Sequence, residues 1–168
     1  MSTKITLRGN PVTVDGDLPA AGAKAPDFKL TNATLADVSL KDFAGKRKVM
    51  NIYPSIDTPT CATSVRHFNK DVARKPGTVV LCISMDLPFA QARFCGAEGI
   101  QNVKTLSAFR SPAFGRDYGV QITDSVLSGL LARAVVVVDP AGIVRHTQLV
   151  AEIANEPDYA AALAAIQA

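Results

Sequence analysis

The chain has 168 residues, of which 48% are hydrophobic and 20% are charged, and its formal net charge is +3. This composition is typical of a globular protein and excludes disordered and fibrous classes, and the length fits a single domain spanning residues 1–168. The basic residues are spread along the chain except at Lys46-Arg47-Lys48, which we expect to be a solvated strand entrance, so nucleic acid is not an expected partner.

The first residues lack the apolar core of about 7–15 residues that a signal peptide needs. The longest apolar run, near 134–138, is far shorter than the roughly 20 residues of a membrane span. We therefore expect a cytoplasmic protein that does not enter a membrane. Three cysteines, an odd number without an export signal, argue against a permanent disulfide framework.

Alternating apolar runs at 5–8 and 12–14 meet at Gly9-Asn10-Pro11 and predict a β-hairpin. Farther along, runs of buried-strand length alternate with segments of helical spacing. We expect strands at 28–30, 38–40, 48–53, 78–84, 102–109, 133–138 and 143–150. We expect helices at about 59–74, 88–95, 112–118 and 157–166, the second of them closed by Gly96 and Gly99. This alternation predicts an α/β fold with a mixed sheet covered on both faces.

The stretch PSIDTPTC, residues 54–61, has the pattern of a strand end, a loop and a helix start. Thr58 fits the N-cap and Pro59 the first helical position, so Cys61 occupies the third. Unpaired N–H groups and the positive end of the helix dipole lower the pKa of a thiol placed there and favour the nucleophilic thiolate. A small buried core residue is the commoner role of a free cysteine, so position alone leaves both interpretations open.

Pro54, Thr58 and Cys61 match the Pro-x-x-x-Thr-x-x-Cys motif of peroxiredoxins. The chain resembles the bacterial thiol peroxidase branch of that family, the atypical two-cysteine peroxiredoxins, over nearly its whole length. Segments that carry the resemblance are the N-terminal hairpin, APDF at 25–28, NIYPSIDT at 51–58, DLPFAQ at 86–91, RFCG at 93–96 and ARAV at 132–135. The resemblance implies a thioredoxin-like fold with an N-terminal hairpin and a chemistry that needs no cofactor.

The resemblance implies that the Cys61 thiolate attacks a hydroperoxide and becomes a sulfenic acid. It also implies that Arg133 holds the thiolate and polarises the peroxide, because a guanidinium is permanently charged and carries forked donors. By the same resemblance Thr58 orients the peroxide and Pro54 shields the sulfur from water. Cys95 is implied as the resolving cysteine of an intrachain disulfide, and we expect local unwinding near Cys61 and Cys95 in each cycle.

The implied substrates are hydrogen peroxide and alkyl or lipid hydroperoxides, the implied reductant is thioredoxin, and the family tends to form homodimers. A thioredoxin-like disulfide exchanger usually carries C-x-x-C at the helix start, whereas position 58 is a threonine. A peroxide sensor that oxidises once and signals through a partner shares the same cysteine. A turnover measurement distinguishes the three functions, since only the peroxidase consumes peroxide repeatedly.

Cys82 lies in the middle of the apolar run VVLCIS, so we expect a core thiol that reacts slowly with alkylating agents. The two histidines, His67 and His146, make no metal-ligand spacing with each other or with a cysteine, and no metal is expected. His67 is predicted to be a solvated helix residue.

Overall fold

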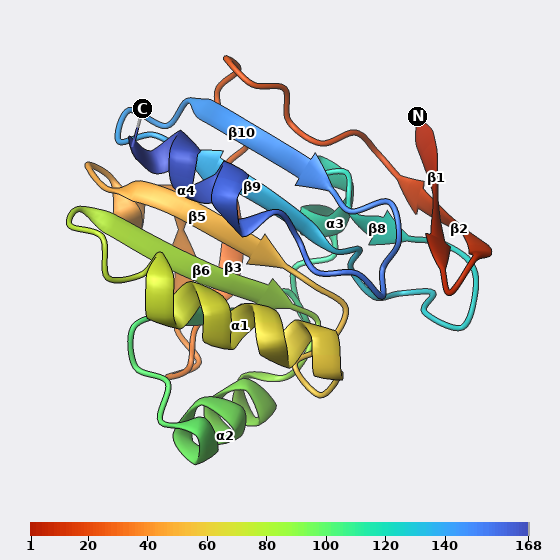
Figure 1. The fold of residues 1–168 in the computed structure, drawn as a ribbon, viewed down its shortest axis with the longest axis horizontal. Coiled ribbons are helices and arrows are strands. Elements are labelled where there is room, and N and C mark those ends of the chain that lie inside the picture. The colour runs from red at the N-terminus through yellow and green to blue at the C-terminus, as the bar shows by residue number, and fades with distance from the viewer. Residues whose placement is uncertain (168) are drawn as a thin grey trace.

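The computed structural model describes residues 1–167, which form a mixed seven-stranded sheet with helices on both faces (Figure 1). The strands of this sheet, in chain order, are β3 (Lys29–Thr31), β4 (Asp37–Ser39), β5 (Arg47–Ile52), β6 (Thr78–Ser84), β7 (Lys104–Ser107), β9 (Ala134–Val138) and β10 (Val144–Leu149). Their spatial order is β10-β9-β5-β6-β7-β3-β4. The central strands β5, β6 and β7 are parallel, and the others pair antiparallel.

The helices are α1 (Pro59–Asp71), α2 (Pro88–Glu98), α3 (Ala113–Asp117), α4 (Tyr159–Gln167) and a short 3-10 helix at Leu40–Phe43. Helices α1 and α4 lie over one face of the central strands, and α2 lies beside α1 toward the edge of the molecule (Figure 1). Among residues 1–167, no helix is long and apolar enough to cross a bilayer.

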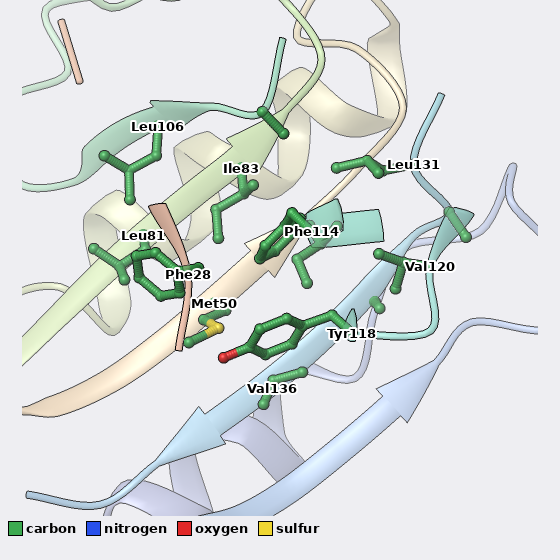
Figure 2. Close-up of a cluster of buried hydrophobic side chains, with 14 of the residues drawn as sticks. Phe28, Met50, Leu81, Ile83, Leu106, Phe114, Tyr118, Val120, Leu131 and Val136 are labelled. Atoms are coloured by element: carbon green, nitrogen blue, oxygen red, sulfur yellow. The ribbon is translucent and has the colours of Figure 1, made fainter. Parts of the chain in front are cut away.

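Side-chain alternation divides the core into two layers, because successive residues of a strand point to opposite faces. On one face, residues such as Met50, Leu81 and Val136 pack against Phe28, Phe114 and Tyr118 (Figure 2). On the other face, the α1 cluster consists of buried residues of the central strands, of α1 and α4 and of the adjoining loops, namely Val49, Tyr53, Ile56, Cys61, Val65, Phe68, Val72, Val80, Cys82, Ile100, Val135, Val137, Ala162 and Ile166. The mixed sheet covered on both faces is therefore confirmed.

A second, three-stranded sheet is formed by β1 (Ser2–Leu7), β2 (Asn10–Asp15) and β8 (Gln121–Ile122). The predicted hairpin is confirmed, but its turn was misplaced: Leu7 pairs with Asn10, so the turn is Arg8-Gly9 and Pro11 belongs to β2. Both turn residues have positive φ, 50° and 81°, as a two-residue hairpin turn requires. Strand β8 was not predicted, since two residues give no periodic signal.

Two further expectations were wrong. Lys48 is only 1% exposed rather than solvated, because it lies on the same strand face as Met50 and Ile52, and its Nζ donates to the Phe43 carbonyl at 3.3 Å. Gly96 does not close α2, which continues to Glu98 and ends at Gly99 in the left-handed conformation. A helix tolerates a glycine in its interior at modest cost, so Gly96 did not mark the end of α2.

Candidate active site

Cys61 lies in the first turn of α1, where the chain leaves the carboxyl end of β5. Thr58 is the N-cap, with an extended backbone (φ −100°, ψ 146°), and Pro59 opens the helix, so both backbone predictions are confirmed. The Thr58 hydroxyl does not cap the helix but donates to the Ser55 carbonyl at 2.9 Å. No acidic residue lies in the first turn, so nothing there opposes a negative charge on sulfur.

Arg133, immediately before β9, reaches the sulfur of Cys61. Its Nη2 donates to Cys61 Sγ at 3.3 Å, and its Nε donates to the Ile153 carbonyl at 2.8 Å. Cys61 is 0% exposed and Arg133 is 2% exposed, so this contact is shielded from water and a cation there interacts strongly with a thiolate. The buried Nη1 has no hydrogen-bond partner among the described residues and remains free to bind an oxygen.

A buried amide and hydroxyl join the first turn of α1 to the sheet. Asn51 Nδ2 on β5 donates to Ser64 Oγ at 3.1 Å, and Ser64 Oγ donates to the Cys61 carbonyl at 2.7 Å. Because both groups are buried, breaking either contact would leave an unsatisfied polar group. This chain of contacts fixes the turn that carries Cys61 against β5.

The loop that precedes α1 is held by the carboxylate of Asp86, at the end of β6. It accepts hydrogen bonds from Ser55 Oγ at 2.7 Å, from the Ile56 N–H at 2.7 Å and from Ser84 Oγ at 2.6 Å. A carboxylate bound by several donors is strongly held, since charge-assisted hydrogen bonds are about twice as strong as neutral ones. No role was predicted for Asp86; its place two residues after the end of β6, a central parallel strand, was the available signal.

Pro54 is buried two residues after the end of β5, so it lies between the sheet and the loop held by Asp86. Thr58 is half-buried, and its hydroxyl faces back into that loop. The structure thus groups Cys61 and Arg133 in direct contact and puts Pro54 and Thr58 on the segment that leads to Cys61. The roles of Pro54 and Thr58 stay predictions.

Cys95 lies on α2 and packs, half-buried, against the α1 cluster that contains Cys61. Burial raises the pKa of the Cys95 thiol. Helix α2 buries only two of its own residues, and ion pairs Arg66–Glu98 and Arg93–Asp57 connect it to α1 and the preceding loop. All three cysteines of the chain are free thiols.

Cys82 is fully buried in the middle of β6, as predicted, and belongs to the same α1 cluster. Its polar neighbour is Asn51 Nδ2, at 3.9 Å from Sγ. Burial raises the pKa of Cys82 well above that of an ordinary thiol. Its slow alkylation stays a prediction.

His67 is not simply solvated. Its ring stacks on Tyr159 of α4 with centroids 3.7 Å apart, and its Nε2 lies 3.2 Å from Asp71 Oδ2. The expectation was incomplete: the side chain is 39% exposed on α1, but α4, distant in sequence, packs on this side of that helix. His67 thus contributes to joining two helices.

Comparison with known proteins agrees with this geometry. Residues 20–163 match the Redoxin family. Thiol peroxidases of Mycobacterium tuberculosis and Mycobacterium bovis are 56% identical over 165 residues, which cover 98% of this chain and 99% of theirs.

Solved structures show the same fold. A peroxiredoxin-like protein from Aquifex aeolicus has a TM-score of 0.92 at 38% identity, covering 99% of this chain and 97% of that one. A thiol peroxidase from Chromobacterium violaceum has a TM-score of 0.87 at 26% identity, covering 98% of this chain and 95% of that one. The expected thioredoxin-like fold and thiol-dependent reduction of peroxides are therefore confirmed. The chain belongs to the redoxin family and, within it, to the thiol peroxidases.

Proposed function

We propose that this thiol peroxidase reduces hydrogen peroxide and organic hydroperoxides with Cys61 as the attacking thiolate, Cys95 as the resolving thiol and thioredoxin as the reductant. The observation that carries the proposal is the buried 3.3 Å contact from Arg133 Nη2 to Cys61 Sγ. A permanently charged guanidinium at this distance stabilises the thiolate form of the sulfur.

In the first step the Cys61 sulfur attacks one peroxide oxygen, an S–O bond forms and the O–O bond breaks. Sulfur is oxidised by two electrons to sulfenic acid, and the departing oxygen takes a proton and leaves as water or an alcohol. Negative charge grows on that oxygen, and Arg133 Nη1, buried and without a partner among the described residues, is a donor available to stabilise it. Thr58 orients the peroxide, and Pro54 keeps water from the sulfur.

In the second step the Cys95 thiol attacks the sulfenic sulfur, an S–S bond forms and water leaves. Cys61 sits in a helix turn and is fully buried, so the first turn of α1 has to unwind for the two sulfurs to meet. Motion of α2 is supported by its small buried surface and by the exposed Arg93–Asp57 ion pair, since such pairs contribute little to stability. Reduced thioredoxin then reduces the Cys61–Cys95 disulfide to two thiols and is itself oxidised to a disulfide.

A homodimer formed through the loops beside the active site is part of the proposal. Three large apolar side chains follow the carboxyl ends of β6 and β7, at the sheet edge where α1 begins, and are exposed: Leu87 at 49%, Phe89 at 66% and Phe109 at 38%. Leu87 and Phe89 flank the start of α2, and Phe109 follows β7. Sedimentation of the wild type and of Phe89→Asp tests this, with a dimer expected only for the wild type; monomeric wild type would refute it.

The catalytic cycle is tested by following NADPH loss with thioredoxin, thioredoxin reductase and either cumene hydroperoxide or hydrogen peroxide. We expect sustained turnover that is abolished in Cys61→Ser and strongly reduced in Cys95→Ser. Mass spectrometry of the oxidised wild type should show one Cys61–Cys95 disulfide per chain. Oxidation by one equivalent without turnover would instead support a peroxide sensor and remove the role of Cys95.

A further inference from the structure

We propose that Glu152 is a positioning residue for Arg133, and that the N-terminal hairpin is thereby part of the support of the active site. The proposal rests on the catalytic role proposed above for Arg133 and Cys61. Glu152 lies in the loop after β10 and touches neither of these side chains; it acts through the carbonyl of its neighbour Ile153.

The Glu152 carboxylate accepts four hydrogen bonds, three from the N-terminal hairpin and one from its own loop. Oε1 accepts from the Gly9 N–H at 2.9 Å and from Thr6 Oγ1 at 3.0 Å. Oε2 accepts from the Arg8 N–H at 3.0 Å and from the Ala154 N–H at 2.9 Å. The N–H groups of Ala154, Gly9 and Arg8 lower the pKa of Glu152 to about 2, so the carboxylate is ionised at neutral pH.

The hairpin turn has a geometry suited to this acceptor. Arg8 and Gly9 are both left-handed, with φ of 50° and 81°, and both of their N–H groups point to the one carboxylate. Successive N–H groups in such turns form a concave site for an anion. A non-glycine residue in this conformation carries strain, which the bound carboxylate offsets at Arg8.

The loop at 150–154 contacts both the backbone and the side chain of Arg133. The Val150 N–H donates to the Arg133 carbonyl at 2.9 Å, and the Arg133 Nε donates to the Ile153 carbonyl at 2.8 Å. Because Nε and Nη2 belong to one planar guanidinium, the position of the Ile153 carbonyl sets the direction in which Nη2 meets Cys61.

Backbone contacts with β1 hold the same carbonyl in place. The Thr6 N–H donates to the Ala151 carbonyl at 2.8 Å, and the Ile153 N–H donates to the Thr6 carbonyl at 2.8 Å. A further contact reaches α1 directly, because Thr60 Oγ1, beside Cys61, donates to the Ala154 carbonyl at 3.2 Å. Loop, hairpin and active site therefore share one hydrogen-bonded network centred on Glu152.

A purely structural role would require only that Glu152 hold the hairpin to the body, and Asp124 provides the matched control. Asp124 accepts hydrogen bonds from the Thr13 N–H at 2.7 Å and from Thr13 Oγ1 at 2.6 Å, so it also binds the hairpin through a carboxylate. Its pKa is lowered by these contacts as well. It has no hydrogen bond to Arg133, Cys61 or the 150–154 loop within the described residues.

The experiment compares Glu152→Gln, Asp124→Asn, Arg133→Lys and the Glu152→Gln/Arg133→Lys double variant in the full chain. The rate constant for Cys61 oxidation by hydrogen peroxide is measured by competition with a haem peroxidase, since the chain has no tryptophan to report it. The pH midpoint of Cys61 alkylation by iodoacetamide is measured by peptide mass spectrometry. Circular dichroism gives the melting temperature of each variant.

We expect Glu152→Gln to lower the oxidation rate constant about tenfold and to raise the alkylation midpoint, because misplaced catalytic groups lose rate steeply. Asp124→Asn should lower the melting temperature and leave both readouts within about twofold of the wild type. In the Arg133→Lys background, Glu152→Gln should add less than about a twofold loss, because the guanidinium that it positions is gone.

Similar kinetics in Glu152→Gln and Asp124→Asn, or an undiminished Glu152→Gln effect in the Arg133→Lys background, would overturn the positioning role alone. A normal rate constant in Arg133→Lys would instead contradict the catalytic site on which it rests. If Glu152→Gln does not fold, Thr6→Val removes one of the four hydrogen bonds and should move both readouts in the same direction by a smaller factor; no shift in that variant would refute the proposal.

Discussion

Cys61 and Cys82 lie in the same apolar cluster, and both are 0% exposed, yet their surroundings differ in charge. Cys61 stands at a helix N-terminus with a guanidinium nitrogen at 3.3 Å, whereas Cys82 stands in the middle of a strand with an amide nitrogen at 3.9 Å. Burial raises the pKa of Cys82, because the neutral amide of Asn51 only partly offsets the loss of water around a thiolate. Burial therefore does not decide whether a cysteine reacts; the groups that face its sulfur do.

The largest expected difference is in alkylation. At pH 7.5 we expect iodoacetamide to modify Cys61 faster than Cys82 by a factor on the order of a thousand, because the thiolate is the nucleophile. Both residues are 0% exposed in the folded structure, so static exposure does not distinguish them. Peptide mass spectrometry of timed samples gives both rates, with Cys82→Ala to verify the assignment. Comparable rates would show that access rather than charge controls these thiols.

Removing the cation should make the reactivity of Cys61 more like that of Cys82. In Arg133→Met we expect the rate constant for peroxide oxidation of Cys61 to fall about 100- to 1,000-fold, the usual cost of losing one preorganised donor to a developing anion. Arg145→Met is the control, because Arg145 is half-exposed and pairs with Asp139 at 2.7 Å. An equal loss in both variants would mean that net charge, and not the contact at Cys61, governs the rate.

Local signals were enough to predict the layered fold and the helix start that carries Cys61. Strand β6 begins and ends at residues 78 and 84 as expected, because a continuous apolar run defines it. The start of α1 is also as predicted, since N-cap and Pro preferences depend on adjacent residues. The resemblance, not periodicity, was needed to connect Arg133 to Cys61, which lie 72 residues apart.

What the sequence did not reveal depends on distant partners. Glu152 binds the Gly9 N–H from 143 positions away, and Asp86 binds the Ile56 N–H from 30 positions away. A carboxylate has no periodic or spacing signal that indicates which backbone N–H it will accept. The error at Lys48 has the same cause: a 3-10 helix covers its strand face, and the charge run alone did not reveal that cover.

A smaller effect is expected at Asp86, because this residue holds the loop before Cys61 and does not contact the sulfur itself. In Asp86→Asn we expect about a tenfold lower rate constant for Cys61 oxidation, since the loop bearing Thr58 loses its charged acceptor. The control is Asp42→Asn, which weakens a similar contact with the Ser39 N–H at 2.7 Å in the 3-10 helix. Alkylation of Cys82 should stay slow in both variants; rapid alkylation would mean that the core has opened.

The smallest expected effect is on acid stability. The pKa of Glu152 is about 2 in the folded protein against an ordinary 4.5, so its contribution to the free energy of unfolding is complete above pH 4.5 and is lost as the pH falls toward 2. Glu152→Gln cannot titrate. Its melting temperature should therefore lie a few degrees below that of the wild type at pH 6, and the gap should close between pH 4.5 and 2.5.

Melting curves from pH 7 to 2.5 measure this gap, and labelling of Cys82 with a disulfide reagent that reacts in acid detects opening of the core. A gap that stays constant to pH 2.5 would contradict the hydrogen-bonded carboxylate. Because Glu152 remains ionised well below neutral pH, a loss of Cys61 reactivity between pH 7 and 5 would not come from protonation of this carboxylate. Slow labelling of Cys82 over that range would show that the fold around the two buried thiols is intact. A remaining difference in their reactivity would then come from the charges that face each sulfur.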